Sequence, residues 1–185
     1  KLIHLPLQSG CTKILKDMNR KYTKNQYLSL VENMKKEIPN LTLSTDIIVG
    51  FPGETEEDFA DTLEVVEKVN FEQVYMFIYS RRVGTPADKM ESQIPEEIKH
   101  ERFNKLKVLV EKQIAEKNKE YISTVQNVLI EGKSKTNEKL LTGRTDSNKV
   151  VVLEAEENVI GKVLPIKIVS EHMWYLKGKI ANLSI

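Results

Sequence analysis

The chain has 185 residues, of which 40% are hydrophobic, and its 28 Lys and Arg residues nearly balance its 27 Asp and Glu residues. This length and composition suffice for one folded domain or two small ones. The net charge of +1 is not that of a strongly basic nucleic-acid binder, and the longest apolar runs are too short to span a membrane. The single cysteine, Cys11, excludes an internal disulfide framework and a thiolate cluster supplied by this chain alone. We therefore expect a cytoplasmic protein with no membrane span and no metal site of its own.

The start of the chain reads as a strand, because residues 1–7 are mostly apolar and carry neither an initiator methionine nor a leader. We expect the chain to be a piece of a longer polypeptide whose N-terminal domains are missing.

The first part of the chain alternates between strand and helix patterns. Strand-like segments at about 2–7, 42–49 and 73–79 are separated by spans with helical periodicity. Thr23 can cap the first of these helices, and a capping-box pattern at 55–58 opens the second. Crossovers of this kind make the strands parallel. The pattern predicts an α/β fold, either a doubly wound sheet or part of a (β/α) barrel.

The second part of the chain changes from long helical patterns to short strands. Pro95 suits the first turn of a helix that continues to about Tyr121. Five short Val- and Ile-rich segments follow, broken by glycines, at 125–131, 140–145, 150–153, 160–169 and 174–180. Such a series predicts a small antiparallel β-barrel. We therefore expect two domains, residues 1–120 and 121–185.

Two polar residues between the first strand and the helix that Thr23 can cap are candidates for ligand binding. Gln8 directly follows the first strand, where its amide could offer a donor and an acceptor to a polar ligand; the alternative is a turn residue before Gly10. Arg20 could hold a carboxylate through two parallel hydrogen bonds, and the alternative is a solvated arginine.

Asp46 lies inside an apolar strand, so its carboxylate needs a partner if the strand is buried. A ligand ammonium, a ribose hydroxyl or Arg20 would serve, and a structural ion pair is the alternative. The following Gly50-Phe-Pro-Gly53 ends the strand and lets the backbone approach a ligand. The simplest role for Glu54 is to place its negative charge near the partial positive charge at the N-terminus of the next helix.

The segment after the third strand places two cations beside an aromatic ring. Tyr79, Arg81 and Arg82 could meet a phosphate or a nucleobase, or could form a surface loop anchored on glutamates of a nearby helix. His4, inside the first strand, is expected to be a satisfied histidine of the core. Cys11 is expected to be the residue at which a helix begins.

The tail of the chain, from residue 121, is mildly basic, with nine Lys or Arg against seven Asp or Glu. A basic face containing aromatic residues would form if the strands align, and the residues concerned are Arg144, Lys149, Lys162, Trp174, Tyr175, Lys177 and Lys179. This arrangement favours nucleic-acid binding, although charges on the outside of small barrels are common.

Six motifs in register resemble the second half of the radical S-adenosylmethionine methylthiotransferases. They are residues 4–10 (HLPLQSG), 18–20 (MNR), 22–23 (YT), 45–54 (TDIIVGFPGE), 77–80 (FIYS) and 84–87 (GTPA). The tail, with Gly143-Arg-Thr145, Asn148-Lys-Val150 and Ile160-Gly161, is similar to the TRAM domain, an OB-like RNA-binding barrel, of these enzymes. The first two tail elements most resemble the family members that act on isopentenyladenosine in tRNA.

The resemblance implies an enzyme that cleaves S-adenosylmethionine reductively at a 4Fe-4S cluster, so that a 5′-deoxyadenosyl radical abstracts hydrogen from C2 of the modified adenine. A second 4Fe-4S cluster supplies sulfur, and an electron donor such as flavodoxin or ferredoxin is needed. The cysteines that hold both clusters in the family lie outside this chain. This chain alone is therefore expected to be inactive.

The resemblance also implies roles for individual residues. Gln8, Ser9, Arg20 and Asp46 would bind S-adenosylmethionine, with Arg20 on its carboxylate. The residues implied for substrate or tRNA contact are Tyr79, Arg81, Arg82, Arg144, Lys149 and Trp174.

Other functions stay open at this point. Relatives within the family act on threonylcarbamoyladenosine in tRNA or on an aspartate of a ribosomal protein. The chain could also be an RNA-binding module alone, with residues 1–120 as a spacer, or a complete small-molecule α/β enzyme.

Overall fold

The computed structural model describes residues 1–135 and 137–181. The chain forms two compact units, one of residues 3–113 and one of residues from 114 onward together with Lys1 and Leu2. We call them the α/β unit and the barrel unit. Within the described residues, no helix combines the length and the apolar character needed to cross a membrane.

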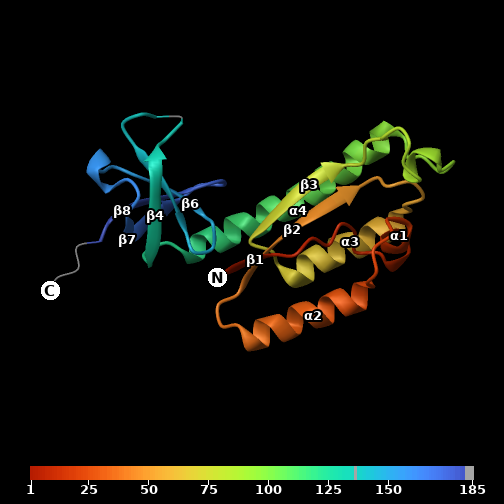
Figure 1. Ribbon diagram of the computed structural model, residues 1–185, viewed down its shortest axis with the longest axis horizontal. Coiled ribbons are helices and arrows are strands. Elements are labelled where there is room, and N and C mark those ends of the chain that lie inside the picture. The colour runs from red at the N-terminus through yellow and green to blue at the C-terminus, as the bar shows by residue number, and fades with distance from the viewer. Residues whose placement is uncertain (136, 182–185) are drawn as a thin grey trace. The chain divides into compact units, whose positions relative to one another are not determined.

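The α/β unit contains a three-stranded sheet in the order β1 (Leu2–His4), β2 (Thr42–Val49), β3 (Gln73–Ile78), as Figure 1 shows. Strands β2 and β3 are parallel, with Asp46 opposite Tyr75, and the expected α/β fold is confirmed. Strand β1 ends earlier than expected. Pro6 has no N–H to give to the ladder, and the chain returns to the sheet through a parallel bridge between Gln8 and Ile47.

Four helices accompany this sheet, and their starts follow the capping signals of the sequence. Helix α1 spans Thr12–Asp17 with Cys11 at its N-cap, as expected, and α2 spans Lys24–Glu37. Helix α3 spans Glu56–Val69, and both α2 and α3 begin with a complete capping box. Helix α4 runs from Glu96 to Glu120, after a short 3₁₀ turn at Ala87–Lys89.

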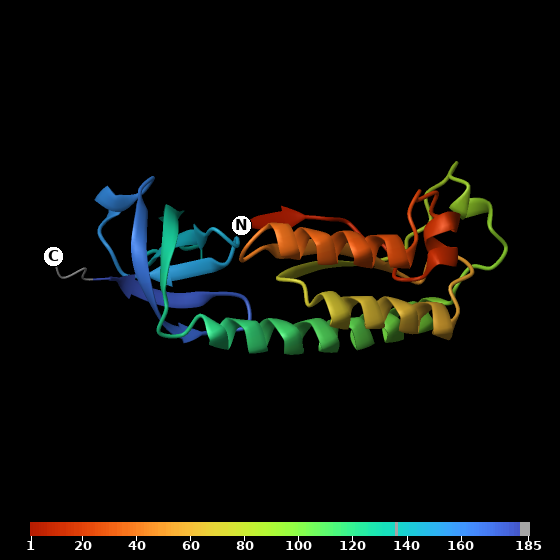
Figure 2. The ribbon, with the colours of Figure 1, turned by 90° about the horizontal axis from the view of Figure 1, so that it is seen from below.

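One face of the sheet is buried against helices and the other is partly open. Leu43, Ile47 and Val49 are at most 2% exposed, whereas Asp46 and Ile48, which alternate with them, are only partly buried. Apolar side chains of α2, α3 and α4 are buried as well. Figure 2 shows α2 and α3 running lengthwise beside each other. Ser44 and Asp46 therefore lie on the face away from the helices, whereas Thr45 lies on the buried face.

The barrel unit closes on itself in the strand order β4-β5-β6-β8-β7, and these strands lie close to the expected positions. Their bounds are Val125–Lys133, Leu141–Thr145, Val150–Leu153, Val163–Glu171 and Leu176–Ile180 for β4 to β8, with a 3₁₀ turn at Glu157–Val159. Strands β6 and β8 pair in parallel, and the other neighbours pair antiparallel. A closed ring with an odd number of strands cannot alternate direction throughout, so a wholly antiparallel barrel was not attainable. The interior is apolar, with Val128, Ile130, Val151, Ile166, Ile168 and Leu176 at 0% exposure.

Candidate functional site

A cavity of about 800 Å³ lies in the α/β unit, at the carboxyl ends of the strands. Gln8, Arg20 and Asp46 all line it, although they come from three different segments of the chain. Parallel sheets commonly bind ligands at this edge. The three residues singled out from the sequence therefore share one candidate binding site.

Gln8 is held by its backbone while its side chain has no partner in the described residues. Its N–H donates to the Asp46 carbonyl at 2.8 Å, and its own carbonyl accepts from Ile48 at 2.9 Å. Its φ of 71° lies in the left-handed region. The residue is only 7% exposed, and a buried amide normally has a hydrogen-bond partner. The amide of Gln8 is thus available for a ligand in the cavity.

Arg20 follows α1 and is fixed by its main chain, since its N–H donates to the Leu15 carbonyl at 2.8 Å. Its side chain is exposed, and within the described part of the chain no carboxylate pairs with it. A guanidinium in this state can take a ligand carboxylate through two hydrogen bonds.

Asp46 has a histidine of the protein, and not Arg20, as its neighbour, which is close to the structural alternative given for it. Its Oδ2 lies 3.5 Å from Nε2 of His4, whose Nδ1 is 2.9 Å from the Ser44 hydroxyl oxygen. The interpretation of His4 as a core histidine is wrong, because 44% of its side chain is exposed. It lies in β1 on the open face of the sheet, next to Tyr75. The carboxylate of Asp46 keeps 27% exposure and can still accept hydrogen bonds from a ligand.

An aromatic wall completes the cavity. Phe51 and Tyr79 meet edge to face with ring centroids 5.3 Å apart, and Phe77 also lines the cavity. The Tyr79 hydroxyl is buried and has no hydrogen-bond partner among the described groups. Sequence reasoning missed Phe51 and Phe77. The alternation along β3, which places Phe77 opposite Ile48, could have indicated Phe77.

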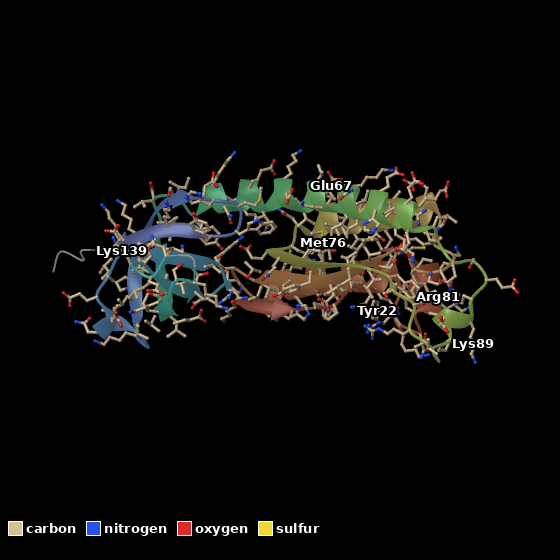
Figure 3. The ribbon with its side chains drawn as sticks, turned by 90° about the horizontal axis from the view of Figure 1, so that it is seen from above. Tyr22, Glu67, Met76, Arg81, Lys89 and Lys139 are labelled. Carbon is tan, nitrogen blue, oxygen red and sulfur yellow. The ribbon has the colours of Figure 1, made fainter. Side chains whose placement is uncertain are left out.

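The two arginines after β3 differ in their surroundings. Arg82 lines the cavity. Arg81 instead pairs with Asp88 of its own loop, with Nε 2.9 Å from Oδ1 and Nη2 donating to the Asp88 carbonyl at 2.8 Å. Figure 3 shows Arg81 and Lys89 on this loop. The loop is therefore braced internally at Arg81 rather than by helix glutamates.

The side chain of Ser9 binds a main-chain N–H next to the cavity and is not among the residues that line the cavity. Its hydroxyl is fully buried, accepts from the Cys11 N–H at 3.2 Å and lies 3.4 Å from the Thr62 hydroxyl oxygen. Next to it, a β-carbon at Gly10 would lie 2.5 Å from the Asp61 carbonyl oxygen. The Ser9-Gly10 segment therefore fastens the Gln8 loop closely to α3.

Glu54 has a role that the sequence did not indicate. Its Oε2 accepts from the Gly50 N–H at 2.8 Å and from Nη1 of Arg102 at 2.8 Å. Burial raises the pKa of Glu54, although Gly50 and Arg102 act in the opposite direction. The carboxylate thus holds the Gly50 turn, which carries Phe51 into the cavity, against α4.

The residues present do not fit an iron–sulfur cluster. No group of three potential ligands occurs among residues 1–135 and 137–181. The thiol of Cys11 is buried and donates to Oδ1 of Asp58 at 3.0 Å. Burial and this hydrogen bond raise the pKa of Cys11, which disfavours the thiolate that binds metals.

The candidate RNA residues of the barrel unit lie on different elements. Arg144 is on β5, Lys149 precedes β6, and Trp174 lies in the hairpin between β7 and β8 with 61% exposure. Arg144 Nε is 3.3 Å from Oε2 of Glu131, and the Lys149 ammonium is 6.0 Å from the centre of the Tyr121 ring. Trp174 is thus the most accessible of the three.

Comparison with known families identifies both parts of the chain. Residues 1–66 match the radical SAM superfamily, and residues 119–181 match the TRAM domain. These two matches confirm the resemblance drawn from the motifs of the chain.

Individual relatives bear the name tRNA-2-methylthio-N(6)-dimethylallyladenosine synthase. The protein of Acetivibrio thermocellus is 54% identical over 97% of this chain and 38% of its own length. That of Clostridium perfringens is 53% identical over 97% and 40%, and that of Caldicellulosiruptor saccharolyticus is 52% identical over 96% and 38%. The chain thus spans about two fifths of the length of the curated relatives it matches.

Proposed function

We propose that this chain is the cofactor- and RNA-binding part of a radical S-adenosylmethionine tRNA methylthiotransferase that modifies C2 of N6-isopentenyladenosine. The convergence of Gln8, Arg20 and Asp46 on one cavity supports this proposal most strongly. Relatives with the same activity in their names align over nearly the whole chain. A tRNA substrate also favours a cytoplasmic location.

The cavity offers suitable groups for each part of S-adenosylmethionine. Arg20 would hold the carboxylate of the methionine moiety, and the Gln8 amide would bind its polar groups. The Asp46 carboxylate would accept from the ribose hydroxyls or the ammonium. Phe51, Phe77 and Tyr79 would form apolar walls, and the buried Tyr79 hydroxyl would gain a partner. The volume of the cavity, about 800 Å³, also suits such a ligand, since ligand pockets usually measure about 300–1,000 Å³.

When bound, S-adenosylmethionine supplies the sulfonium whose reductive cleavage starts radical chemistry. This chain's part is to bind and orient it. The two 4Fe-4S clusters and the contact with an electron donor such as flavodoxin or ferredoxin would belong to other parts of the full-length polypeptide, since the described residues contain no cluster ligands.

We further propose that the two parts of the chain, which meet at about residue 120, bind different ligands. Residues 1–120 would bind S-adenosylmethionine and receive the modified nucleotide, with Arg82 at the rim of the cavity and Arg81 bracing the adjoining loop. Residues 121–185 would contact tRNA as a TRAM domain, with Arg144, Lys149 and Trp174 as contact candidates.

The test is an equilibrium titration of S-adenosylmethionine into a full-length polypeptide that contains this chain, followed by a methylthiolation assay on isopentenylated tRNA. Asp46→Asn should weaken cofactor binding at least about tenfold, since a hydrogen bond to a charged group is worth about 1.5–3 kcal/mol. Asp61→Asn is the matched control, because Asp61 pairs with Lys24 outside the cavity.

Equal affinities of the Asp46→Asn and wild-type proteins would contradict the cofactor site. RNA binding without any affinity for S-adenosylmethionine would instead indicate an RNA-binding module. Methylthiolation of threonylcarbamoyladenosine in tRNA or of a ribosomal-protein aspartate, in place of the proposed nucleoside, would assign the alternative substrates.

A further inference from the structure

Three lysines share the outer face of the β7–β8 hairpin. Lys167 on β7 lies directly opposite Lys179 on β8, and Lys177 lies opposite Ser170. Their direction is fixed by Gly178, because a β-carbon there would stand 2.3 Å from Cγ2 of the buried Ile166. Position 178 thus faces the barrel interior, so that the flanking Lys177 and Lys179 face outward.

These three ammonium groups have no counterion among residues 1–135 and 137–181. All three side chains are exposed, and no carboxylate of the described residues forms an ion pair with them. Like charges directly opposite each other on neighbouring strands destabilise a sheet. The Lys167–Lys179 pair is therefore an unfavourable arrangement that an anionic ligand would relieve.

Two other cations of the barrel unit that were suggested for RNA contact, Arg144 and Lys149, are already engaged within the protein. Arg144 forms an ion pair with Glu131 through Nε, and its Nη1 donates to the Asn148 carbonyl at 3.2 Å and to Asn148 Oδ1 at 3.0 Å. Lys149 faces the Tyr121 ring. A phosphate would have to compete with these contacts, which it need not do at the three lysines.

The tip of the same hairpin presents an aromatic ring on a rigid support. The rings of His172 and Tyr175 stack with centroids 4.4 Å apart, and the His172 N–H donates to the Tyr175 carbonyl at 2.9 Å. The side chain of the buried Asn118 donates to the carbonyls of His172 and Met173 at 2.8 and 3.2 Å. Trp174, within this braced turn, is 61% exposed. An exposed tryptophan at the turn of a hairpin that carries three lysines is suited to stack on an unpaired base.

We propose that the β7–β8 hairpin is the principal RNA-binding surface of the barrel unit. Lys167, Lys177 and Lys179 contact successive backbone phosphates, and Trp174 stacks on one unpaired base of an RNA loop. The exposed apolar side chains on neighbouring strand positions, Val125, Leu129, Val163 and Val169, give the face contact area for ribose and base. This inference deepens the proposed function and rests on its tRNA substrate.

The experiment measures the affinity of the 185-residue chain for a fluorescently labelled tRNA anticodon stem-loop over a series of KCl concentrations. The quantity of interest is the slope of log affinity against log salt. Replacing the three lysines with glutamine (Lys167→Gln, Lys177→Gln, Lys179→Gln) should reduce the magnitude of this slope by about 2, since each lost phosphate contact removes about 0.7.

Trp174→Ala should lower affinity about tenfold at every salt concentration and leave the slope unchanged, because stacking is not ionic. A matched control replaces Lys133, Lys135 and Lys139 with glutamine, which removes the same charge elsewhere on the barrel unit; Figure 3 labels Lys139. This control should change the slope by less than about 1. Arg144→Gln with Lys149→Gln should also change it less than the hairpin variant does.

Circular dichroism thermal melts establish that each variant is folded. If the folded hairpin variant keeps the wild-type slope of log affinity against log salt, the proposal is overturned. The hairpin face would then be assigned to binding a protein partner. An equal loss in the control variant would overturn it as well, because net charge alone would then explain binding. So would absence of RNA binding by the wild-type chain. The S-adenosylmethionine titration is independent of all these results, so the cofactor site can stand when the hairpin site fails.

Discussion

Glu54 and Arg102 form an ion pair of 2.8 Å in which the two side chains are only 1% and 6% exposed. Arg102 also donates to the Glu54 carbonyl at 3.0 Å, so the guanidinium binds one residue at two places. The pair joins the Gly50 turn, at the edge of the cavity, to α4. It therefore connects the candidate binding site to the framework of the α/β unit.

Arg102→Met should lower the free energy of unfolding of the chain by about 3–5 kcal/mol, because it leaves the Glu54 carboxylate buried without its partner. Adding Glu54→Gln to that variant should recover part of the loss. Urea unfolding at neutral pH measures both effects. A single variant as stable as the wild type would show that the pair has no structural role.

Arg20→Lys should weaken S-adenosylmethionine binding about tenfold in the full-length polypeptide, because lysine keeps the charge but not the two-pronged geometry of the guanidinium. Stability should not change, since the Arg20 side chain is exposed. Isothermal titration calorimetry gives the affinity. Retention of full affinity would place the cofactor carboxylate elsewhere.

Asp58 should make stability dependent on pH in the acid range. Burial alone would raise its pKa, but hydrogen bonds from Cys11, Lys13 and the Thr55 N–H lower it to about 2 from an ordinary 3.8. A lowered pKa contributes stability that is present above about pH 4 and lost as pH falls towards 2. Asp58→Asn should therefore cost about 2 kcal/mol at pH 7 and much less at pH 2.

Guanidinium unfolding at the two pH values checks the Asp58 prediction. The control is Glu32→Gln, whose exposed ion pair with Lys36 should contribute less than about 1 kcal/mol at either pH. A cost for Asp58→Asn that is the same at both pH values would contradict the assignment.

Gly178→Ala should destabilise the barrel unit by about 1–3 kcal/mol, because the new methyl group would overlap Ile166 in a filled interior. In an Ile166→Ala background the same change should cost little, since the overlapping atom is gone. A double-mutant cycle by thermal unfolding measures the coupling. Additive costs would show that position 178 does not face Ile166.

Elements with strong local signals were predicted well from the sequence. Thr23 and Thr55 begin α2 and α3 as expected, and Val150–Leu153 is the predicted strand. The joint lining of one cavity by Gln8, Arg20 and Asp46 follows from the parallel sheet, because its carboxyl ends meet at one edge.

Features that depend on distant partners were not predictable. The ion pair of Glu54 joins residues 48 positions apart, and no local pattern selects Arg102 from the other arginines. The exposure of His4 depends on which face of β1 lacks helices. Lys167 was missed because its importance arises only from the register that sets it opposite Lys179.

The closure of the barrel unit limits how it can recognise another molecule. Each of its five strands has a hydrogen-bonded neighbour on both sides. Strand β4 pairs with both β5 and β7, and the pairing of β6 with β8 closes the ring. Among the described strands of this barrel, none has a side without a partner strand that could pair through its main chain with an extended peptide or a second copy. Discrimination between partners must therefore reside in its side chains and hairpin turns, where single substitutions can change it without altering the fold.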